Sequence, residues 1–431
     1  MKRVNIIGAG LAGSEACSFF LKKGYEVHLY ERRPLINDGA HETGLFGELV
    51  CSNSLKSKQI ENAAGLLKEE MRLMDSIMME ATLTSEVPSG NALSVDRLLF
   101  AQKITDSLKK YPNLIIHEEE VSSFPEGVCI LATGPLTSES LLNCLQEKIG
   151  KKNLSFFDAS APIVKKETID FSKAYFKSRF EQGDSAYLNC PFGKEEYFTF
   201  VKELTGAKKA MLHEFDTRYF EGCLPLEVMA ARGIETLRHG PLKPFGLDTP
   251  EHPRPYAVAQ LRQDNALGDY YNIVGFQTNL TYGEQKRVFS LIPGLEHAEF
   301  VRYGQMHRNA YLDAPICLNE NLSLKNDPNI FIAGQLSGVE GYVESAACGI
   351  AAAIFAYRKM EGLSACSFPP DTVLGALLKY LRNADGGYFM PMNANWALFP
   401  GIRKENRLEA AQVALKSIAS FWEEYGLDRR I

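Results

Sequence analysis

The chain has 431 residues, of which 45% are hydrophobic and 23% are charged, and its formal net charge is −6. This length is enough for about two or three domains. The negative net charge excludes the class of proteins that are strongly basic along their whole length. Nine cysteines, an odd number with no Cys-x-x-Cys pair, argue against a disulfide framework and against a zinc site. We therefore expect no metal and a reducing, cytoplasmic setting.

We also expect no membrane segment. The longest apolar run, residues 346–356, is shorter than the roughly 20 residues that a helix needs to cross a bilayer. The N-terminal residues lead directly into a predicted strand and do not have the charge and apolar pattern of a signal peptide.

The first predicted unit is a strand, a glycine-rich turn, a helix and a second strand. Residues 4–7 form the first strand, Gly8-Ala9-Gly10-Leu11-Ala12-Gly13 follow it, and a helix covers residues 14–23. The second strand, at 27–30, ends at Glu31. Glycines in such a turn let backbone N–H groups approach a pyrophosphate, and an acidic residue at this distance contacts a ribose. The unit therefore predicts a dinucleotide site with Glu31 at the ribose.

The later elements predict two domains, one inserted into the other. Helices are expected at 62–79, 96–110, 338–358 and 408–425, and apolar strands at 128–134 and 329–334. Between them the pattern changes to shorter, aromatic-rich strands with several prolines. We predict a first part of an FAD-binding domain at 1–152, an inserted α+β domain on the substrate or RNA side at 153–301, and the second part with C-terminal helices at 302–431.

Two further turns favour FAD over NAD. Leu131-Ala132-Thr133-Gly134 is a strand and turn of the kind that precedes the insertion in two-part flavoproteins, and residues 331–341 again read as strand, turn and helix. The predicted fold is α/β, a Rossmann-like FAD domain of the two-dinucleotide-binding (glutathione-reductase-like) type. The predicted cofactor-binding residues are Gly8, Ala9, Gly10, Leu11, Ala12, Gly13, Glu31, Gly134, Gly334, Gln335, Gly338 and Gly341.

Two cysteines stand out because polar or turn residues surround them. Cys51 precedes Ser52-Asn53-Ser54, and Cys223 lies in Glu221-Gly222-Cys223-Leu224-Pro225. Such surroundings suit a partly exposed thiol, whereas free cysteine is usually a small buried apolar side chain. We predict the buried, structural role for the others: Cys17, Cys129, Cys144, Cys190, Cys317, Cys348 and Cys366.

Several motifs together resemble one family, the folate- and FAD-dependent tRNA (uracil-5-)-methyltransferases, TrmFO. They are Gly8-Ala9-Gly10-Leu11-Ala12-Gly13-Ser14-Glu15-Ala16, Leu49-Val50-Cys51-Ser52-Asn53-Ser54-Leu55, Phe220-Glu221-Gly222-Cys223-Leu224-Pro225, Gly334-Gln335-Leu336-Ser337-Gly338-Val339-Glu340-Gly341-Tyr342 and Pro391-Met392-Asn393-Ala394-Asn395-Trp396. The resemblance spans nearly the whole chain, with Gly47 where the family pattern suggests alanine.

The resemblance implies formation of 5-methyluridine at position 54 in the T loop of tRNA. The one-carbon donor would be 5,10-methylenetetrahydrofolate, NADH or NADPH would supply electrons, and FAD would carry the methylene group at N5. A thiolate that adds to C6 of uracil makes C5 nucleophilic, and a base then removes the C5 proton. We assign Cys223 as the nucleophile and Cys51 as the base, and the reverse assignment stays open.

Other interpretations remain open at this point. A related branch of the family acts on rRNA, and the same FAD fold serves small-molecule oxidoreductases that need neither cysteine. An S-adenosylmethionine-dependent RNA methyltransferase would leave the turn near Gly334 unexplained, and a non-enzymatic flavin-containing RNA-binding factor would tolerate loss of both thiols. Weaker candidates for contact with ligand or RNA are His41, Glu42, Tyr282, Tyr303, Tyr342, Lys208, Lys209, Arg218, Arg232 and Arg238.

Overall fold

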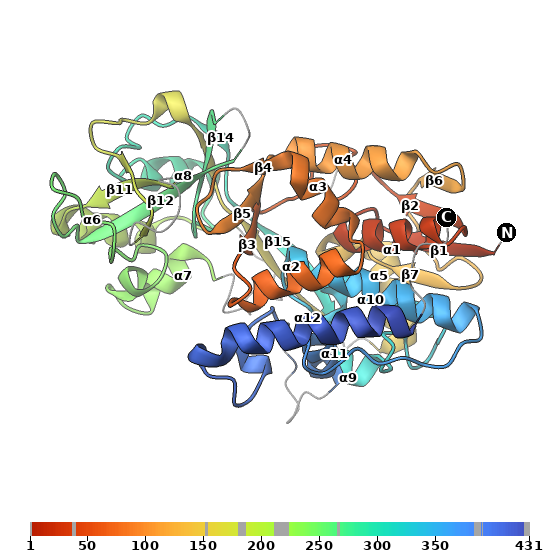
Figure 1. Cartoon of the computed structure of the whole chain (residues 1–431). Helices are drawn as coiled ribbons and strands as arrows, with labels where there is room; N and C mark the ends of the chain where they lie inside the picture. Colours follow the sequence, from red (N-terminus) through yellow and green to blue (C-terminus); the bar gives the residue numbers. More distant parts are fainter. Residues whose placement is uncertain are drawn as a thin grey trace.

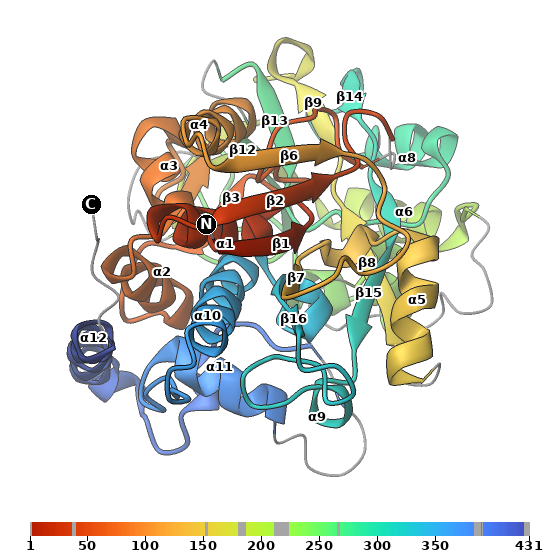
Figure 2. The ribbon, with the colours of Figure 1, turned by 90° about the vertical axis from the view of Figure 1, so that its right-hand side faces the viewer.

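The structure is a computed structural model and describes residues 2–36, 40–150, 154–179, 187–210, 224–264, 268–382, 389 and 391–425. A five-stranded sheet in the order β16-β7-β1-β2-β6 lies inside the larger domain, and all its pairings are parallel (Figure 2). Its strands are β1 (Arg3–Ile7), β2 (Glu26–Glu31), β6 (Leu114–Glu118), β7 (Cys129–Leu131) and β16 (Ile330–Ile332). The late strand β16 completes the sheet by pairing with β7.

Helices cover this sheet. The glycine turn leads into α1 (Leu11–Lys22), which packs against α10 (Tyr342–Met360), and a Cβ on Gly349 would lie 2.3 Å from the carbonyl oxygen of Ala12. The backbones of these two helices are therefore in direct contact. The other long helices of this domain are α2 (Ala63–Leu73), α3 (Ile77–Ser85), α4 (Arg97–Lys109), α5 (Glu139–Ile149), α11 (Val373–Arg382) and α12 (Arg407–Glu424).

The inserted part has its own antiparallel sheet and its own apolar core, and it forms a second lobe beside the larger domain (Figure 1). The sheet order is β10-β11-β12-β13-β9-β14. Its elements are β9 (Ile163–Lys165), β10 (Tyr175–Phe176), β11 (Tyr187–Phe192), α6 (Lys194–Gly206), α7 (Leu226–Ala231), β12 (Ala257–Gln263), β13 (Tyr270–Ile273), α8 (Tyr282–Phe289) and β14 (Phe300–Arg302). The domain division at 152/153 and 301/302 stays a prediction, because strand pairing alone does not define independent units.

Two smaller sheets complete the architecture. The strands β8 (Leu154–Ser160) and β15 (Gln305–Leu312) lead into and out of the inserted part and pair with each other antiparallel. A three-stranded sheet in the order β3-β5-β4 carries the segment that follows Cys51. Its strands are β3 (Ser54–Ser57), β4 (Glu86–Val87) and β5 (Ala92–Val95).

The sequence pattern predicts one helix over 62–79, and this prediction is wrong. The structure has α2 and α3 there, because Asp75 takes a positive φ of 60° and Ser76 starts a new helix by accepting the N–H of Met79. The helix predicted at 338–358 begins at Tyr342 instead, since Gly341 has a φ of 117°.

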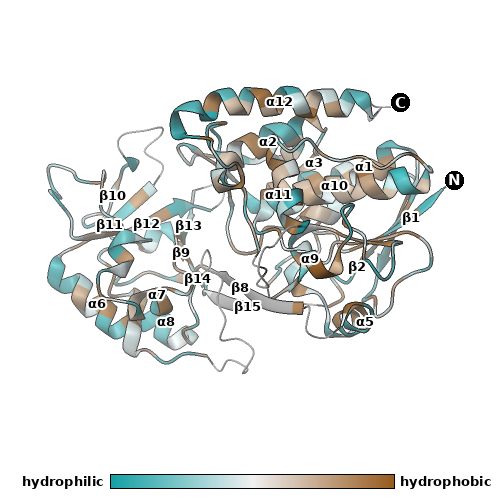
Figure 3. Ribbon diagram, turned by 90° about the horizontal axis from the view of Figure 1, so that it is seen from below, coloured by the Kyte–Doolittle hydropathy of each residue, from teal (hydrophilic) through white to brown (hydrophobic). Residues whose placement is uncertain are grey.

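The C-terminal amphipathic helix is confirmed as α12, with buried residues at Ala411, Ala414, Ile418 and Phe421. Figure 3 shows hydrophilic and hydrophobic residues alternating along this helix at the edge of the domain. Among the helices of the described residues, none is long and apolar enough to cross a membrane.

Candidate active site

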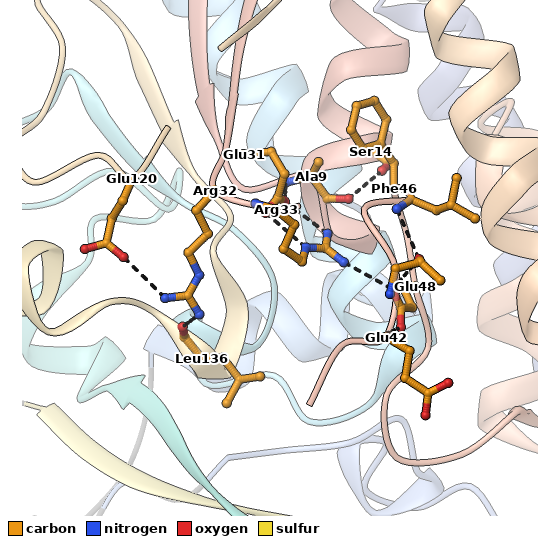
Figure 4. Close-up of polar contacts among 12 residues, drawn as sticks. Ala9, Ser14, Glu31, Arg32, Arg33, Glu42, Phe46, Glu48, Glu120 and Leu136 are labelled. Carbon is orange, nitrogen blue, oxygen red and sulfur yellow. Dashed lines mark hydrogen bonds and ion pairs between the residues drawn. The ribbon is translucent and has the colours of Figure 1, made fainter. Parts of the chain in front are cut away.

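The carboxylate of Glu31 holds the glycine-rich turn to the end of β2 (Figure 4). It accepts a hydrogen bond from the backbone N–H of Ala9 at 2.9 Å, and the guanidinium of Arg33 binds both its oxygens at 3.0 Å. Burial would raise the pKa of Glu31, but the hydrogen bond and charge of Arg33 outweigh it and hold that pKa below its usual value. Glu31 is therefore ionised in the wall of the site, and a ribose hydroxyl that binds it would share it with Arg33.

Two positions of the turn carry glycine for different physical reasons. A Cβ on Gly13 would lie 1.9 Å from the carbonyl oxygen of Gly8, so no side chain fits there. A Cβ on Gly10 would meet no atom of the described residues within 4 Å, and Gly10 has an ordinary φ of −69°. Neither packing nor backbone conformation requires glycine at position 10. The missing side chain instead leaves room for a ligand against the N-terminus of α1, where free N–H groups favour an anion.

Two adjoining pockets connect Glu31 with Cys51. The first has an empty volume of about 540 Å³ and includes Glu31 and Arg32 in its wall, and the second has about 760 Å³ and includes Cys51. Their shared lining residues are Gly10, His41, Thr133 and Leu136. The first end is charged, whereas the second is lined mainly by apolar residues and by the turns after β7 and β16. This arrangement fits a dinucleotide whose ribose lies at Glu31 and whose flavin ring lies beside Cys51.

The thiol of Cys51 contacts the hydroxyl of Tyr342 on the first turn of α10. The two atoms are 2.9 Å apart, and the same hydroxyl oxygen accepts the backbone N–H groups of Cys51 at 2.7 Å and Ser52 at 3.2 Å. Burial raises the pKa of Tyr342 well above its ordinary value near 10, so the hydroxyl stays protonated. With both lone pairs used by N–H donors, its own proton is left for the sulfur of Cys51.

Residues from the inserted domain fix the loop that carries Cys51. Arg262, near the end of β12, donates to the Ser52 hydroxyl at 2.7 Å and to the Asn53 side-chain oxygen at 3.1 Å. Arg97, at the start of α4, donates to the carbonyl oxygen of Val50 at 2.9 Å and binds Asp264 at 2.8 Å. The loop is therefore held from the larger domain and from the inserted domain at once.

The structure brings most predicted site residues together and places the others behind the site. Those that line the two pockets are Gly8, Gly10, Leu11, Ala12, Glu31, Cys51, Gly134, Gly334 and Gln335. The others shape the backbone around the site. The N–H of Ala9 donates to Glu31, and Gly13 packs against the glycine-rich turn. Gly338 lies against the ring of Phe389, and Gly341 precedes α10.

Cys223 and Arg218 lie outside the described residues. Of the weaker candidates, His41 lines both pockets and Tyr342 contacts Cys51, whereas Arg238 is engaged locally with Tyr256 and Glu235. Within the described ranges, no group of three or more His, Cys, Asp or Glu side chains is placed to hold a metal ion.

Sequence reasoning missed Arg33, Arg97 and Arg262. Arg33 carried a local signal, since it stands two residues after the predicted ribose carboxylate. Arg97 and Arg262 carried none, because their partners lie far away in the sequence and only the folded chain brings them together.

The parallel sheet, the glycine turn and the late return of the chain to the sheet define the Rossmann-like FAD-binding class of flavoproteins. In agreement, the structure superposes on Aquifex aeolicus GidA in two crystal forms, with TM-scores of 0.72 and 0.73 at 18% and 17% identity. The match covers 99% of this chain and 74% and 76% of those chains. The family described as Glucose inhibited division protein A matches residues 3–364.

Named relatives define the family more closely. The methylenetetrahydrofolate--tRNA-(uracil-5-)-methyltransferase TrmFO of Lactobacillus johnsonii is 52% identical over 99% of this chain and 100% of its own length. The proteins of the same name from Desulforudis audaxviator and Listeria innocua are 52% and 51% identical, over 98% and 97% of this chain and 99% of their own length. The chain belongs to the TrmFO family.

Proposed function

We propose that this chain is an FAD-dependent enzyme that transfers the one-carbon unit of 5,10-methylenetetrahydrofolate to C5 of a uridine in tRNA, at position 54 of the T loop. The observation that carries the proposal is the contact of Cys51 with Tyr342 in the pocket that the three glycine-rich segments form. The names of the relatives support the same reaction. A cytoplasmic setting, with NADH or NADPH as reductant, belongs to the same proposal.

The pocket residues divide between the two ends of the cofactor. The glycine-rich turn at residues 8–13, together with the N-terminus of α1, would hold the pyrophosphate, and Glu31 with Arg33 would hold the ribose. Gly134, Gly334 and Gln335 would border the flavin end. Bound FAD would supply the redox chemistry, taking a hydride from the nicotinamide and delivering it to the one-carbon unit.

The base role falls to Cys51. A thiolate there receives the proton of the Tyr342 hydroxyl as a hydrogen bond, which stabilises the charged form without transferring the proton. Arg262 and Arg97 fix the loop on both sides of the sulfur, so its position does not depend on the substrate. A positioned thiolate at the flavin end can remove the C5 proton of a uracil.

We assign the nucleophile role to Cys223. The only ground for this assignment is the chemistry of the uracil ring. The thiolate of Cys223 would form a C–S bond to C6 of uracil, which places the electron pair on C5, and this bond would break again, returning the thiolate, once the C5 proton has left and hydride has completed the methyl group. The exchange of roles between the two cysteines is the alternative that an experiment must separate.

Transfer of labelled methylene from folate to RNA tests the reaction. We expect label in a tRNA transcript, no label in the same transcript with cytidine at position 54, and a yellow holoenzyme. Transfer to an rRNA transcript alone would move the substrate to the rRNA branch. A colourless protein that takes up no flavin, or a yellow one that labels neither RNA, would refute the proposal.

A covalent trap tests the roles of the cysteines. RNA with 5-fluorouridine at the target position cannot release its C5 substituent as a proton, so the C6 adduct persists. We expect the adduct with Cys51→Ala and none with Cys223→Ala, read by denaturing electrophoresis. The opposite pattern would exchange the two assignments.

A further inference from the structure

A second concave site lies beside the candidate active site, where the first residues of α2 and α12 meet. We call it the α2–α12 groove; its empty volume is about 720 Å³. The two helices lie side by side in Figure 1. The lining of the groove includes the side chains of Lys56, Ser57, Asn62, Asn395, Trp396 and Arg407. Among the residues that the structure describes, the lining has two charged side chains, which are both cations, and no carboxylate.

Both cations are held in place. Lys56 Nζ binds the buried carboxylate of Glu344 at 2.7 Å, and its side chain remains 41% exposed. The guanidinium of Arg407 lies 5.6 Å from the ring centre of Trp396, and its Nε is shielded from solvent without a partner among the described residues. The Trp396 ring is itself fixed, since its indole N–H donates to the carbonyl oxygen of Glu61 at 2.7 Å. A planar guanidinium set in this way suits an oxyanion such as a phosphate.

Polar donors complete the lining. The side chain of Asn62 does not cap α2, and its amide instead donates to the Ser57 hydroxyl at 3.0 Å. The N–H groups in the first turn of α2, at Ala63 and Ala64, therefore receive no side-chain cap from Asn62. Cations, amides and uncapped N–H groups on one open surface favour a negatively charged ligand.

The groove is joined to the candidate active site through the first turn of α10. Glu344, which holds Lys56, also accepts the N–H of Ala394 at 2.9 Å and stands two residues after Tyr342, the partner of Cys51. Lys56 lies five residues beyond Cys51, which limits their Cα separation to about 17 Å. A polymer whose reactive base enters the pocket at Cys51 must place its neighbouring nucleotides on the surface around that pocket.

We propose that the α2–α12 groove binds the phosphodiester backbone of the RNA next to the target uridine. This inference rests on the proposed function and adds to it the surface that receives the RNA strand. Arg407 and Lys56 contact phosphate oxygens, and Asn62 and Asn395 contact phosphate or ribose. These contacts position the strand and read no sequence.

The experiment uses the full-length holoenzyme and a T-arm stem-loop RNA with the target uridine. Its dissociation constant is measured by fluorescence anisotropy at several salt concentrations. We expect Arg407→Gln to weaken binding several-fold and to lower the slope of log affinity against log salt by about 0.7 to 0.9, the value for one lost phosphate contact. Lys416→Gln, an exposed cation later on the same helix, is the matched control and keeps the wild-type slope.

A second variant distinguishes an effect on RNA binding from a loss of folding. Asn62→Asp puts a carboxylate into the groove at a helix N-cap, where aspartate is as favourable as asparagine. We expect its thermal midpoint to match the wild type and its RNA affinity to fall.

Three results would overturn the inference. The first is the same affinity and slope for Arg407→Gln, Asn62→Asp and Lys416→Gln. The second is slower flavin reduction by NADPH in Arg407→Gln with unchanged RNA binding, which would assign the groove to the dinucleotide. The third is weaker binding of polyglutamyl methylenetetrahydrofolate alone, which would assign it to the folate tail. A wild-type enzyme that transfers no label to any RNA would instead refute the proposed function.

Discussion

Replacing Tyr342 by phenylalanine removes one oxygen atom from the candidate active site and keeps the ring. The change leaves the N–H groups of Cys51 and Ser52 without their acceptor and removes the donor to the Cys51 sulfur. A hydrogen bond to a charged group contributes about 1.5–3 kcal/mol. At about 1.4 kcal/mol per factor of ten, we expect the thiolate fraction of Cys51 at a fixed pH to fall about ten- to a hundredfold.

The rate of Cys51 alkylation by iodoacetamide measures this fraction when it is followed by peptide mass spectrometry over a range of pH. The midpoint of the profile should move upward by about one to two pH units, and methyl transfer to tRNA should slow with it. Tyr197→Phe is the matched control, because it removes a buried hydroxyl that donates to the carbonyl oxygen of Ile234 in the inserted domain. An alkylation profile in Tyr342→Phe that overlies the control would refute the role assigned to this hydroxyl.

Four further substitutions test the rest of the site and the scaffold. Arg262→Lys keeps the charge but loses the fork that holds the thiol loop, so methyl transfer should fall about tenfold or more while the flavin absorbance per protein stays the same. Gly10→Ala meets no atom of the described residues, so it should lower flavin content at an unchanged thermal midpoint, whereas Gly13→Ala should lower both, because its Cβ would clash with the turn. Burial raises the pKa of Glu70 to about 8, so the folded chain keeps a proton that the unfolded chain releases near pH 4.5, and stability falls as pH rises between these values. Thermal melts of Glu70→Gln between about pH 5 and 8 should show a smaller fall than the wild type, and an equal fall would assign the pH dependence to other groups.

The parts of the fold that local spacing determines were predicted well. The N-terminal unit depends on glycine positions within one short segment, and β1, α1 and β2 lie within a few residues of their predicted bounds. The break between α2 and α3 was missed because the apolar spacing of Met71, Met74 and Met78 continues through it. A single residue with positive φ, Asp75, ends the helix there, and aspartate at one position is too weak a signal to overrule that spacing.

The sequence predicts those residues of the candidate site whose role depends only on the motif in which they stand. The glycine turns and Cys51 meet at one pair of pockets because parallel strands bring their carboxyl ends to one edge of the sheet. The partners of the thiol loop could not be predicted in this way. Tyr342 was a candidate for stacking and proves to be a hydrogen-bond partner, and Arg262 had no local signal at all.

The inserted domain does more than present a separate surface, because the end of β12 is bonded directly to the thiol loop. Arg262 binds Ser52, Asp264 binds Arg97, and the Asn53 amide donates to the carbonyl oxygen of Gln263 at 2.9 Å. Since such bonds are lost beyond about 3.5 Å, a shift of β12 by about an ångström would release the loop. The orientation of the inserted domain and the position of the Cys51 sulfur are therefore set by the same contacts. A ligand that moves this domain must also move the thiol or break those bonds.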